Sequence, residues 1–207
     1  MSSLPRHPDV TRAGILVAVT LVMAALFTGM IANHAHAVAA AMQIGRPAPD
    51  FTARDTKGTS LSLSQFRGKT VVLEWTNADC PFTRKHYDSG NMQSVQSLAQ
   101  RDGVIWLSIV SSAPGKQGYV NGPAADVLTQ ARMAAPTAVL LDPSGTVGKL
   151  YGAKTTPHMF VIDKNGALRY MGGMDSLTTT DAGDIMKAEP YLKEAMVAVE
   201  VTAMDVS

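Results

Sequence analysis

Cysteine is the residue that this sequence most conspicuously lacks. The 207 residues contain one cysteine, Cys80. A single cysteine excludes an intramolecular disulfide and any metal site built from several thiolates. If the protein is exported, a lone cysteine points to a free reactive thiol or to a mixed disulfide with another molecule.

The sequence also lacks an excess of charge of either sign. It has 18 Lys and Arg residues against 17 Asp and Glu residues, which leaves a formal net charge of +1. No electrostatic argument therefore supports binding to nucleic acid or to an acidic membrane surface. Repeats and low-complexity tracts are also missing, and the length suits one domain with a core plus an appendage.

The N-terminal residues have the pattern of an export segment. Arg6 and Arg12 precede an apolar run over residues 13–31, and the A-x-A patterns 35–37 and 39–41 follow it. This order predicts a secretory signal peptide, and the length of the run leaves an uncleaved membrane anchor as the alternative. We therefore expect residues 1–41 to be the signal peptide or anchor and residues 42–207 to be an exported domain, periplasmic in a bacterium.

The most informative stretch surrounds the cysteine. Residues 71–73 are β-branched and apolar, residues 76–79 are small or polar, and Pro81 follows Cys80. The pattern predicts a buried strand, a loop and a helix that begins at Pro81, with Cys80 as its N-cap. The helix dipole and the nearby Arg84 and Lys85 would lower the thiol pKa and favour the nucleophilic thiolate. The alternative is a buried and inert thiol.

The remaining pattern predicts an α/β domain. A hairpin is expected over 51–54 and 59–61. It precedes a β-α-β unit that begins with the strand before Cys80, continues with a helix over 81–100 interrupted near 88–90, and ends with a strand over 104–110. A helix over 123–134, with Val127, Leu128 and Ala131 on its packing face, then leads to a strand over 137–141. Further elements are expected as a short helix over 147–151, a hairpin over 159–162 and 168–171, and a terminal helix over 189–201 that packs through Tyr191, Leu192, Ala195, Met196 and Val199.

Glu-Trp-Thr-Asn-Ala-Asp-Cys-Pro-Phe-Thr, over residues 74–83, resembles the active-site segment of thioredoxin-fold redox proteins. It is most similar to the redoxin group, in which the alkyl hydroperoxide reductase/thiol-specific antioxidant (AhpC/TSA) family and periplasmic TlpA-like thiol–disulfide proteins meet. The opening over residues 45–51 and the Thr156-Pro157 segment are also similar, and the resemblance covers about residues 43–175. It implies a thioredoxin-like fold: a central mixed β-sheet flanked by helices, with an N-terminal hairpin extension.

The resemblance also implies roles for single residues. Cys80 matches the first cysteine of the Cys-x-x-Cys motif, and Glu74 resembles a buried carboxylate that exchanges a proton behind the active site. The alternative for Glu74 is a partly exposed residue at the end of a strand. Thr156 and Pro157 would form a cis peptide facing the cysteine and shape the surface that receives a substrate. No cofactor is expected.

The sequence departs from both related patterns. Thr83 occupies the position of the second cysteine, so a dithiol cycle within the chain is excluded. Asn77 occupies the position at which peroxiredoxins have a threonine. Arg84 is near the cysteine, but the sequence does not identify it as the arginine that activates peroxide.

Three functions remain compatible with one cysteine. Cys80 can reduce a peroxide through a sulfenic acid with an external thiol as reductant, or exchange with a protein or low-molecular-weight thiol or disulfide. The third function is a redox-inactive binding module on the same fold. A less favoured alternative is a copper-handling domain in which Cys80, His86 and His158 form a soft metal site.

Overall fold

The computed structural model describes residues 42–204, and the predicted export segment lies outside the described residues. Within the described part, no helix combines the length and the apolar character needed to cross a membrane.

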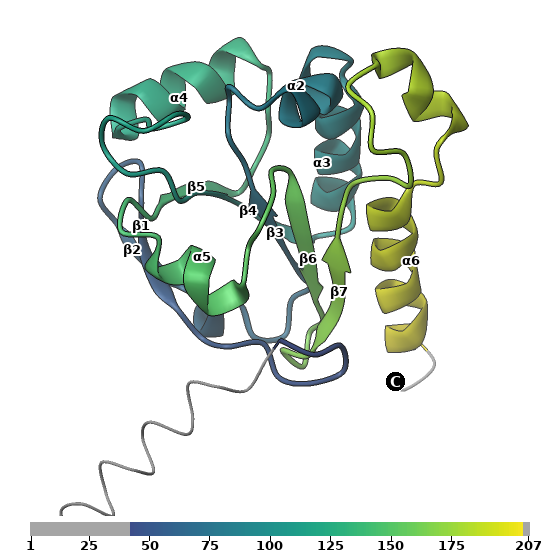
Figure 1. The fold of residues 1–207 in the computed structure, drawn as a ribbon. Helices are drawn as coiled ribbons and strands as arrows, with labels where there is room; N and C mark the ends of the chain where they lie inside the picture. Colours follow the sequence, from purple (N-terminus) through teal and green to yellow (C-terminus); the bar gives the residue numbers. More distant parts are fainter. Residues whose placement is uncertain (1–41, 205–207) are drawn as a thin grey trace, which may run out of the picture. The chain divides into compact units, whose positions relative to one another are not determined.

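The described residues form a mixed seven-stranded sheet with helices on both faces (Figure 1). The strand order is β2-β1-β5-β4-β3-β6-β7, in which β3, β4 and β5 are parallel and the other pairs antiparallel. The strands are β1 (Thr52–Asp55), β2 (Ser60–Ser62), β3 (Val71–Trp75), β4 (Ile105–Val110), β5 (Ala138–Leu141), β6 (His158–Ile162) and β7 (Leu168–Gly172). This arrangement confirms the predicted mixed sheet, its β-α-β unit and the N-terminal hairpin.

The helices are η2 (Leu63–Phe66), α2 (Pro81–Asp88), α3 (Asn91–Arg101), α4 (Gly122–Ala131), α5 (Thr146–Tyr151), η3 (Ala182–Lys187) and α6 (Tyr191–Met204). The predicted interruption of the helix after the cysteine is confirmed. Gly90 separates α2 from α3 with φ of +77°, a left-handed conformation that glycine adopts without steric cost.

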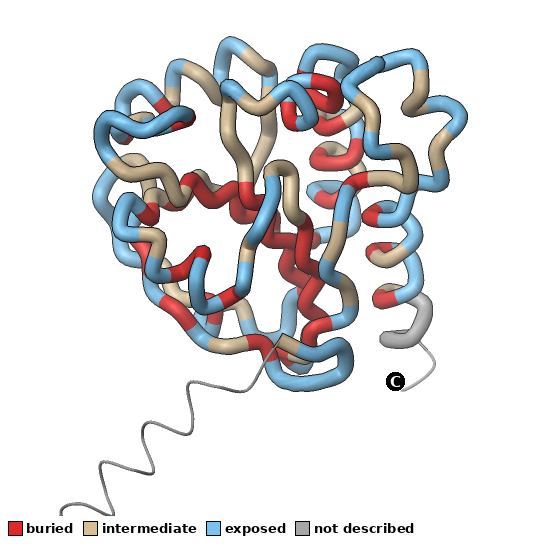
Figure 2. Tube along the Cα trace, viewed as in Figure 1, coloured by how far each residue is buried: buried red, intermediate tan, exposed pale blue. Residues whose placement is uncertain are grey.

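The core lies on both faces of the central strands β3 and β6, which Figure 2 shows as a buried band through the middle of the domain. Side chains alternate along β3, so Leu73 and Trp75 pack into one cluster and Val72 into the other. The first cluster contains an aromatic group of Phe51, Trp75, Tyr151 and Phe160. The second lies under α2, α3 and α6 and includes Met92, Trp106 and Leu192.

The predicted packing face of α4 is wrong. Val127 is 66% exposed, Ala131 is also exposed, and Leu128 is only partly buried. The helix instead approaches its neighbours through small residues near its start, where Ala125 is 2% exposed. A Cβ atom on Gly122 would lie 2.2 Å from the carbonyl oxygen of Thr56, so this close approach requires glycine. The small residues of the first turn therefore make the close contact, and Val127 and Ala131 face the solvent.

The predicted packing face of α6 is correct except at its first residue. Leu192, Met196 and Val199 are buried and Ala195 packs against them. Tyr191 is 39% exposed, whereas its neighbour Leu192 in the same first turn is completely buried.

Candidate active site around Cys80

Cys80 is the N-cap of α2, as predicted. Its backbone is extended, with φ of −74° and ψ of 123°, and Pro81 takes the first helical position. The Cys80 carbonyl accepts a hydrogen bond from the Arg84 amide at 2.9 Å, which starts the helix. The thiol therefore lies at the positive end of the helix dipole, partly accessible to solvent.

The cysteine faces the segment that precedes β6. The Cys80 thiol donates to the carbonyl oxygen of Thr156 at 2.9 Å, and the Thr156-Pro157 peptide is cis. The antiparallel register of β3 and β6, which pairs Trp75 with His158, brings the two segments to the same edge of the sheet. The cis peptide implied by the family resemblance is therefore confirmed.

The surroundings of Cys80 act on its pKa in both directions. Burial raises the pKa, whereas the nearby side chains of Thr156 and Thr83 and the backbone amides of Phe82 and Thr83 lower it. The contact to the Thr156 carbonyl favours the protonated thiol. The net result is a pKa below that of an ordinary cysteine, so the site favours the thiolate.

Thr83 lies on α2 at the position of the absent second cysteine. Its side chain is completely buried, and its hydroxyl makes no regular hydrogen bond. The polar group with which it interacts is the Cys80 sulfur, whose pKa it lowers. A buried hydroxyl without a regular partner is unusual in a folded protein.

Glu74 is completely buried, which excludes the alternative of a partly exposed strand-end residue. Tyr87 donates to Glu74 Oε1 at 2.8 Å, and Trp106 Nε1 and Ser108 Oγ donate to Oε2 at 2.8 and 2.7 Å. Ser108 is the register partner of Glu74 on β4, so the predicted β-α-β unit places it there. The pKa of Tyr87 is raised well above its usual value, first by burial and then by Glu74.

Two further predicted residues have local roles. The Asn77 side chain accepts a hydrogen bond from the Asp79 amide at 2.9 Å, which closes the loop before Cys80. Arg84 forms a surface ion pair with Asp88 at 3.4 Å, and both side chains are more than half exposed.

Sequence reasoning missed Arg132, which follows α4. Its Nη2 donates to the carbonyl oxygen of Ala78 at 3.1 Å, and its guanidinium lies 4.5 Å from the centre of the Tyr87 ring. Arg132 thus connects the cysteine loop with the tyrosine that binds Glu74. It is distant in sequence from both, so no local motif indicates it.

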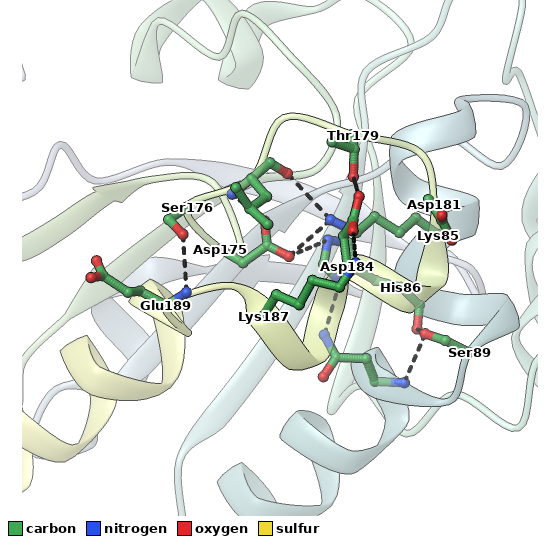
Figure 3. A network of polar contacts seen from close by, with 12 residues as sticks. Lys85, His86, Ser89, Asp175, Ser176, Thr179, Asp181, Asp184, Lys187 and Glu189 are labelled. Atoms are coloured by element: carbon green, nitrogen blue, oxygen red, sulfur yellow. Dashed lines mark hydrogen bonds and ion pairs between the residues drawn. The ribbon is translucent and has the colours of Figure 1, made fainter.

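Sequence reasoning also missed a second buried polar network, which Figure 3 shows. The Lys85 side chain is 1% exposed, and its ammonium binds Asp175 Oδ2 at 3.0 Å and the Leu177 carbonyl at 3.2 Å. His86 Nε2 lies 3.8 Å from the same Asp175 oxygen. These contacts fasten the segment that follows β7 onto α2.

The described residues do not support the less favoured alternative of a copper site formed by Cys80, His86 and His158. Among the described residues, no group of three or more His, Cys, Asp or Glu side chains is arranged to hold a metal ion. His86 is buried beside Asp175 and forms a hydrogen bond with Asn91 at 2.8 Å. His158 instead packs on Phe160, with ring centres 4.5 Å apart. The His86 imidazole on α2 and the His158 imidazole on β6 therefore each make contacts that do not involve Cys80.

The fold and the site define a class: a thioredoxin-like domain with a single cysteine at a helix N-terminus, facing a cis-proline. Residues 44–171, more than half of the chain, match the model of the AhpC/TSA family. The chain therefore belongs to the AhpC/TSA family.

The relatives are consistent with this assignment. The chain is 28% identical over 136 residues to thiol-disulfide oxidoreductase ResA of Geobacillus kaustophilus, with 62% of this chain and 68% of the relative covered. ResA of Bacillus cereus is 27% identical over 132 residues, with 60% and 66% covered.

Solved structures show the same fold. An uncharacterized conserved protein from Geobacillus kaustophilus aligns with a TM-score of 0.60 at 18% identity, over 67% of this chain and 72% of that chain. A putative thiol:disulfide interchange protein DsbE from Chlorobium tepidum aligns with a TM-score of 0.53 at 22% identity, over 79% and 99%. The predicted thioredoxin-like fold is therefore confirmed.

Proposed function

We propose that this protein is a thiol–disulfide oxidoreductase that works through Cys80 alone and uses an external thiol to complete its cycle. The observation that carries the proposal is the Cys80 thiol, whose pKa is lowered at the start of α2, next to a cis-proline and with Thr83 in place of a second thiol. Relatives named thiol-disulfide oxidoreductases support the same class of reaction.

The reaction needs two exchange steps. The Cys80 thiolate attacks one sulfur of a disulfide, forms a mixed disulfide with it and releases the other sulfur as a thiolate. A second, external thiolate then attacks the mixed disulfide, which restores the Cys80 thiolate and leaves the partner as a new disulfide. Thr83 has no sulfur with which to perform this second step, so the partner must supply it.

We assign Glu74 the role of proton acceptor and donor behind the thiol. Its hydrogen-bond partners are Tyr87, Trp106 and Ser108, so proton exchange with Cys80 requires an intermediate group. A cavity of about 30 Å³ beside Tyr87 and Ser108 is large enough for a water molecule. The Thr76 hydroxyl, which lines this cavity, is buried without a hydrogen-bond partner and would bind such a water.

The substrate-facing surface in this proposal consists of Thr156, Pro157, Asn77 and Arg84. Thr83, which was also predicted to face the substrate, is completely buried and lies behind this surface. We also propose that residues 1–41 direct the domain out of the cytoplasm, to the periplasm in a bacterium, where disulfide exchange with other proteins is common.

The test is reaction of the purified domain with glutathione disulfide. We expect one glutathione adduct on Cys80, formed faster than on free cysteine at neutral pH, and none on Cys80→Ser. Mass spectrometry measures the adduct and its rate of formation. The proposal fails if the wild-type rate equals that of free cysteine, and that outcome would favour a redox-inactive binding module.

Peroxide reduction is the second candidate, because the matching family is that of alkyl hydroperoxide reductases and thiol-specific antioxidants. The thiolate would attack the O–O bond, retain one oxygen as a sulfenic acid and release the other as alkoxide or hydroxide. Two external thiols would then remove the oxygen as water and restore Cys80. Peroxide consumption with added thiol, in wild type but not in Cys80→Ser, identifies this activity.

A further inference from the structure

The loop that carries the cysteine, residues 76–80, is in contact with the β4–α4 connection, residues 111–121. The Gly118 amide donates a hydrogen bond to Asp79 Oδ2 at 2.9 Å. The Asn77 side chain lies against the same glycine and also accepts the hydrogen bond from the Asp79 amide. One residue of the connection therefore contacts both side chains that shape the loop before the thiol.

Glycine is required at position 118 for two independent reasons. Its φ is +75°, a conformation that other residues adopt only at a cost. A Cβ atom there would also lie 2.3 Å from Asn77 Oδ1, far inside van der Waals contact. Gly115, in the same connection, has a nearly identical φ of +76° but no atom within 4 Å of the place that a Cβ would occupy. The chain thus contains a matched control for the close contact.

We propose that Asp79 and Gly118 form a clamp that positions the Cys80 thiolate for attack on a disulfide. Disulfide exchange requires the attacking sulfur to approach along a defined direction, so a small shift of the thiolate slows the reaction. Asp79 directly precedes Cys80, and the hydrogen bond from Gly118 to its side chain holds the loop at that point. Both are positioning residues, and their role rests on the proposed exchange activity at Cys80.

The test separates the hydrogen bond of Asp79 from its charge. Asp79→Asn removes the negative charge but keeps a side-chain oxygen to accept from Gly118, whereas Asp79→Ala removes both. Gly118→Ala introduces the clash with Asn77, and Gly115→Ala introduces the same backbone strain without a clash. The rate of reaction with glutathione disulfide is measured for each variant at a pH at which the thiol is fully ionised, so that changes in pKa do not contribute.

We expect Asp79→Ala and Gly118→Ala to lower this limiting rate about tenfold, and Asp79→Asn and Gly115→Ala to stay within about twofold of wild type. Alkylation by iodoacetamide, a small reagent with fewer demands on direction, should change less in all four variants. Equal rates for Asp79→Asn and Asp79→Ala, or for Gly118→Ala and Gly115→Ala, would overturn the proposal.

A second readout does not depend on the proposed function. Amide hydrogen exchange at Asp79 and Cys80, whose N–H groups both bond to Asn77, reports how firmly the loop is held. The exchange should accelerate in Asp79→Ala and Gly118→Ala but not in the two controls. If wild type does not react with glutathione disulfide, the proposed function fails, and this pattern alone decides for or against the clamp.

Discussion

Two buried charges lie close to α2, and the protein accommodates them in different ways. Glu74 is surrounded by three neutral donors, and the ring of one of them, Tyr87, lies against the Arg132 guanidinium. Lys85 is bound directly to an opposite charge, Asp175. The neutral donors around Glu74 carry no charge that depends on it, whereas the two members of an ion pair depend on each other. The first arrangement belongs to the residue for which we propose proton transfer, and the second fastens the segment after β7 to α2.

The sharpest test of this contrast is Lys85→Met. Removal of the ammonium leaves Asp175 buried without its cation, so we expect a loss of about 3–5 kcal/mol in the free energy of unfolding. Urea denaturation measures the loss. The double variant Lys85→Met/Asp175→Leu should recover most of it, because both charges are then absent. If Lys85→Met is as stable as Lys85→Met/Asp175→Leu, the stabilities of Lys85 and Asp175 are not coupled.

The next effect concerns His86, which contacts the same Asp175. Burial, partly opposed by Asp175 and reinforced by Lys85, lowers the pKa of His86 to about 4 from the model-compound value of 6.5. The unfolded chain therefore binds a proton more readily than the native protein. Stability should be complete above pH 6.5, fall as the pH decreases towards 4, and change no further through His86 below that value.

The size of this effect is on the order of 3 kcal/mol. We would measure unfolding free energies from pH 7 to pH 4 for wild type and for His86→Gln, and the difference between the two curves isolates the histidine from other titrating groups. Parallel curves would contradict the prediction. In Lys85→Met, the loss of the nearby cation should raise the His86 pKa towards 6.5, so the pH range of the effect becomes narrower at its lower end and the effect becomes smaller.

A smaller effect is expected at Glu74, where single donors can be removed. Tyr87 is the only hydrogen-bond donor described for Oε1, whereas Oε2 has both Trp106 and Ser108. Tyr87→Phe should therefore cost about 1–3 kcal/mol and Ser108→Ala less, as measured by urea denaturation. A larger loss in Ser108→Ala than in Tyr87→Phe would contradict the prediction that Oε1 depends on a single donor and Oε2 on two.

The smallest expected effect is that of Arg132→Gln. The variant loses the stacking on Tyr87 and weakens the bond to Ala78, so we expect a loss of about 1 kcal/mol in unfolding free energy. Arg101→Gln, at the exposed end of α3, is the control and should change stability by less than about 0.5 kcal/mol. Equal losses in the two variants would show that the contacts of Arg132 with Tyr87 and Ala78 do not stabilise the protein.

The sequence predicts the parts of this structure that depend on local patterns. The β-branched run before Cys80, Pro81 at the helix start and Gly90 at the break each specify the backbone nearby, and the structure confirms all three. The cis peptide at Pro157 is different, because it follows from the family resemblance and not from the residues alone.

Contacts between distant segments were not predictable in the same way. Lys85 and Asp175 are far apart in the sequence, and neither belongs to a periodic pattern that would indicate a pair. The prediction for α4 failed because it was made from the spacing of the apolar residues alone. The side of the helix that packs on the domain is set by the close approach at Gly122 and Ala125. Ser108 is an intermediate case, since a predicted parallel pairing with β3 would place it opposite Glu74 once the register is known.

The position of the thiol relative to the start of the domain has a practical consequence. The first described residues are fastened to the β6–β7 turn, through bonds such as Gly45 to Leu168 and Ala48 to Gly166. Cys80 meets the other end of β6, at Thr156, so the length of that strand, about 15 Å, separates the two. The described part of the chain therefore begins at the end of the sheet remote from the thiol (Figure 1), and a label or surface linkage placed at Met42 would be attached away from Cys80.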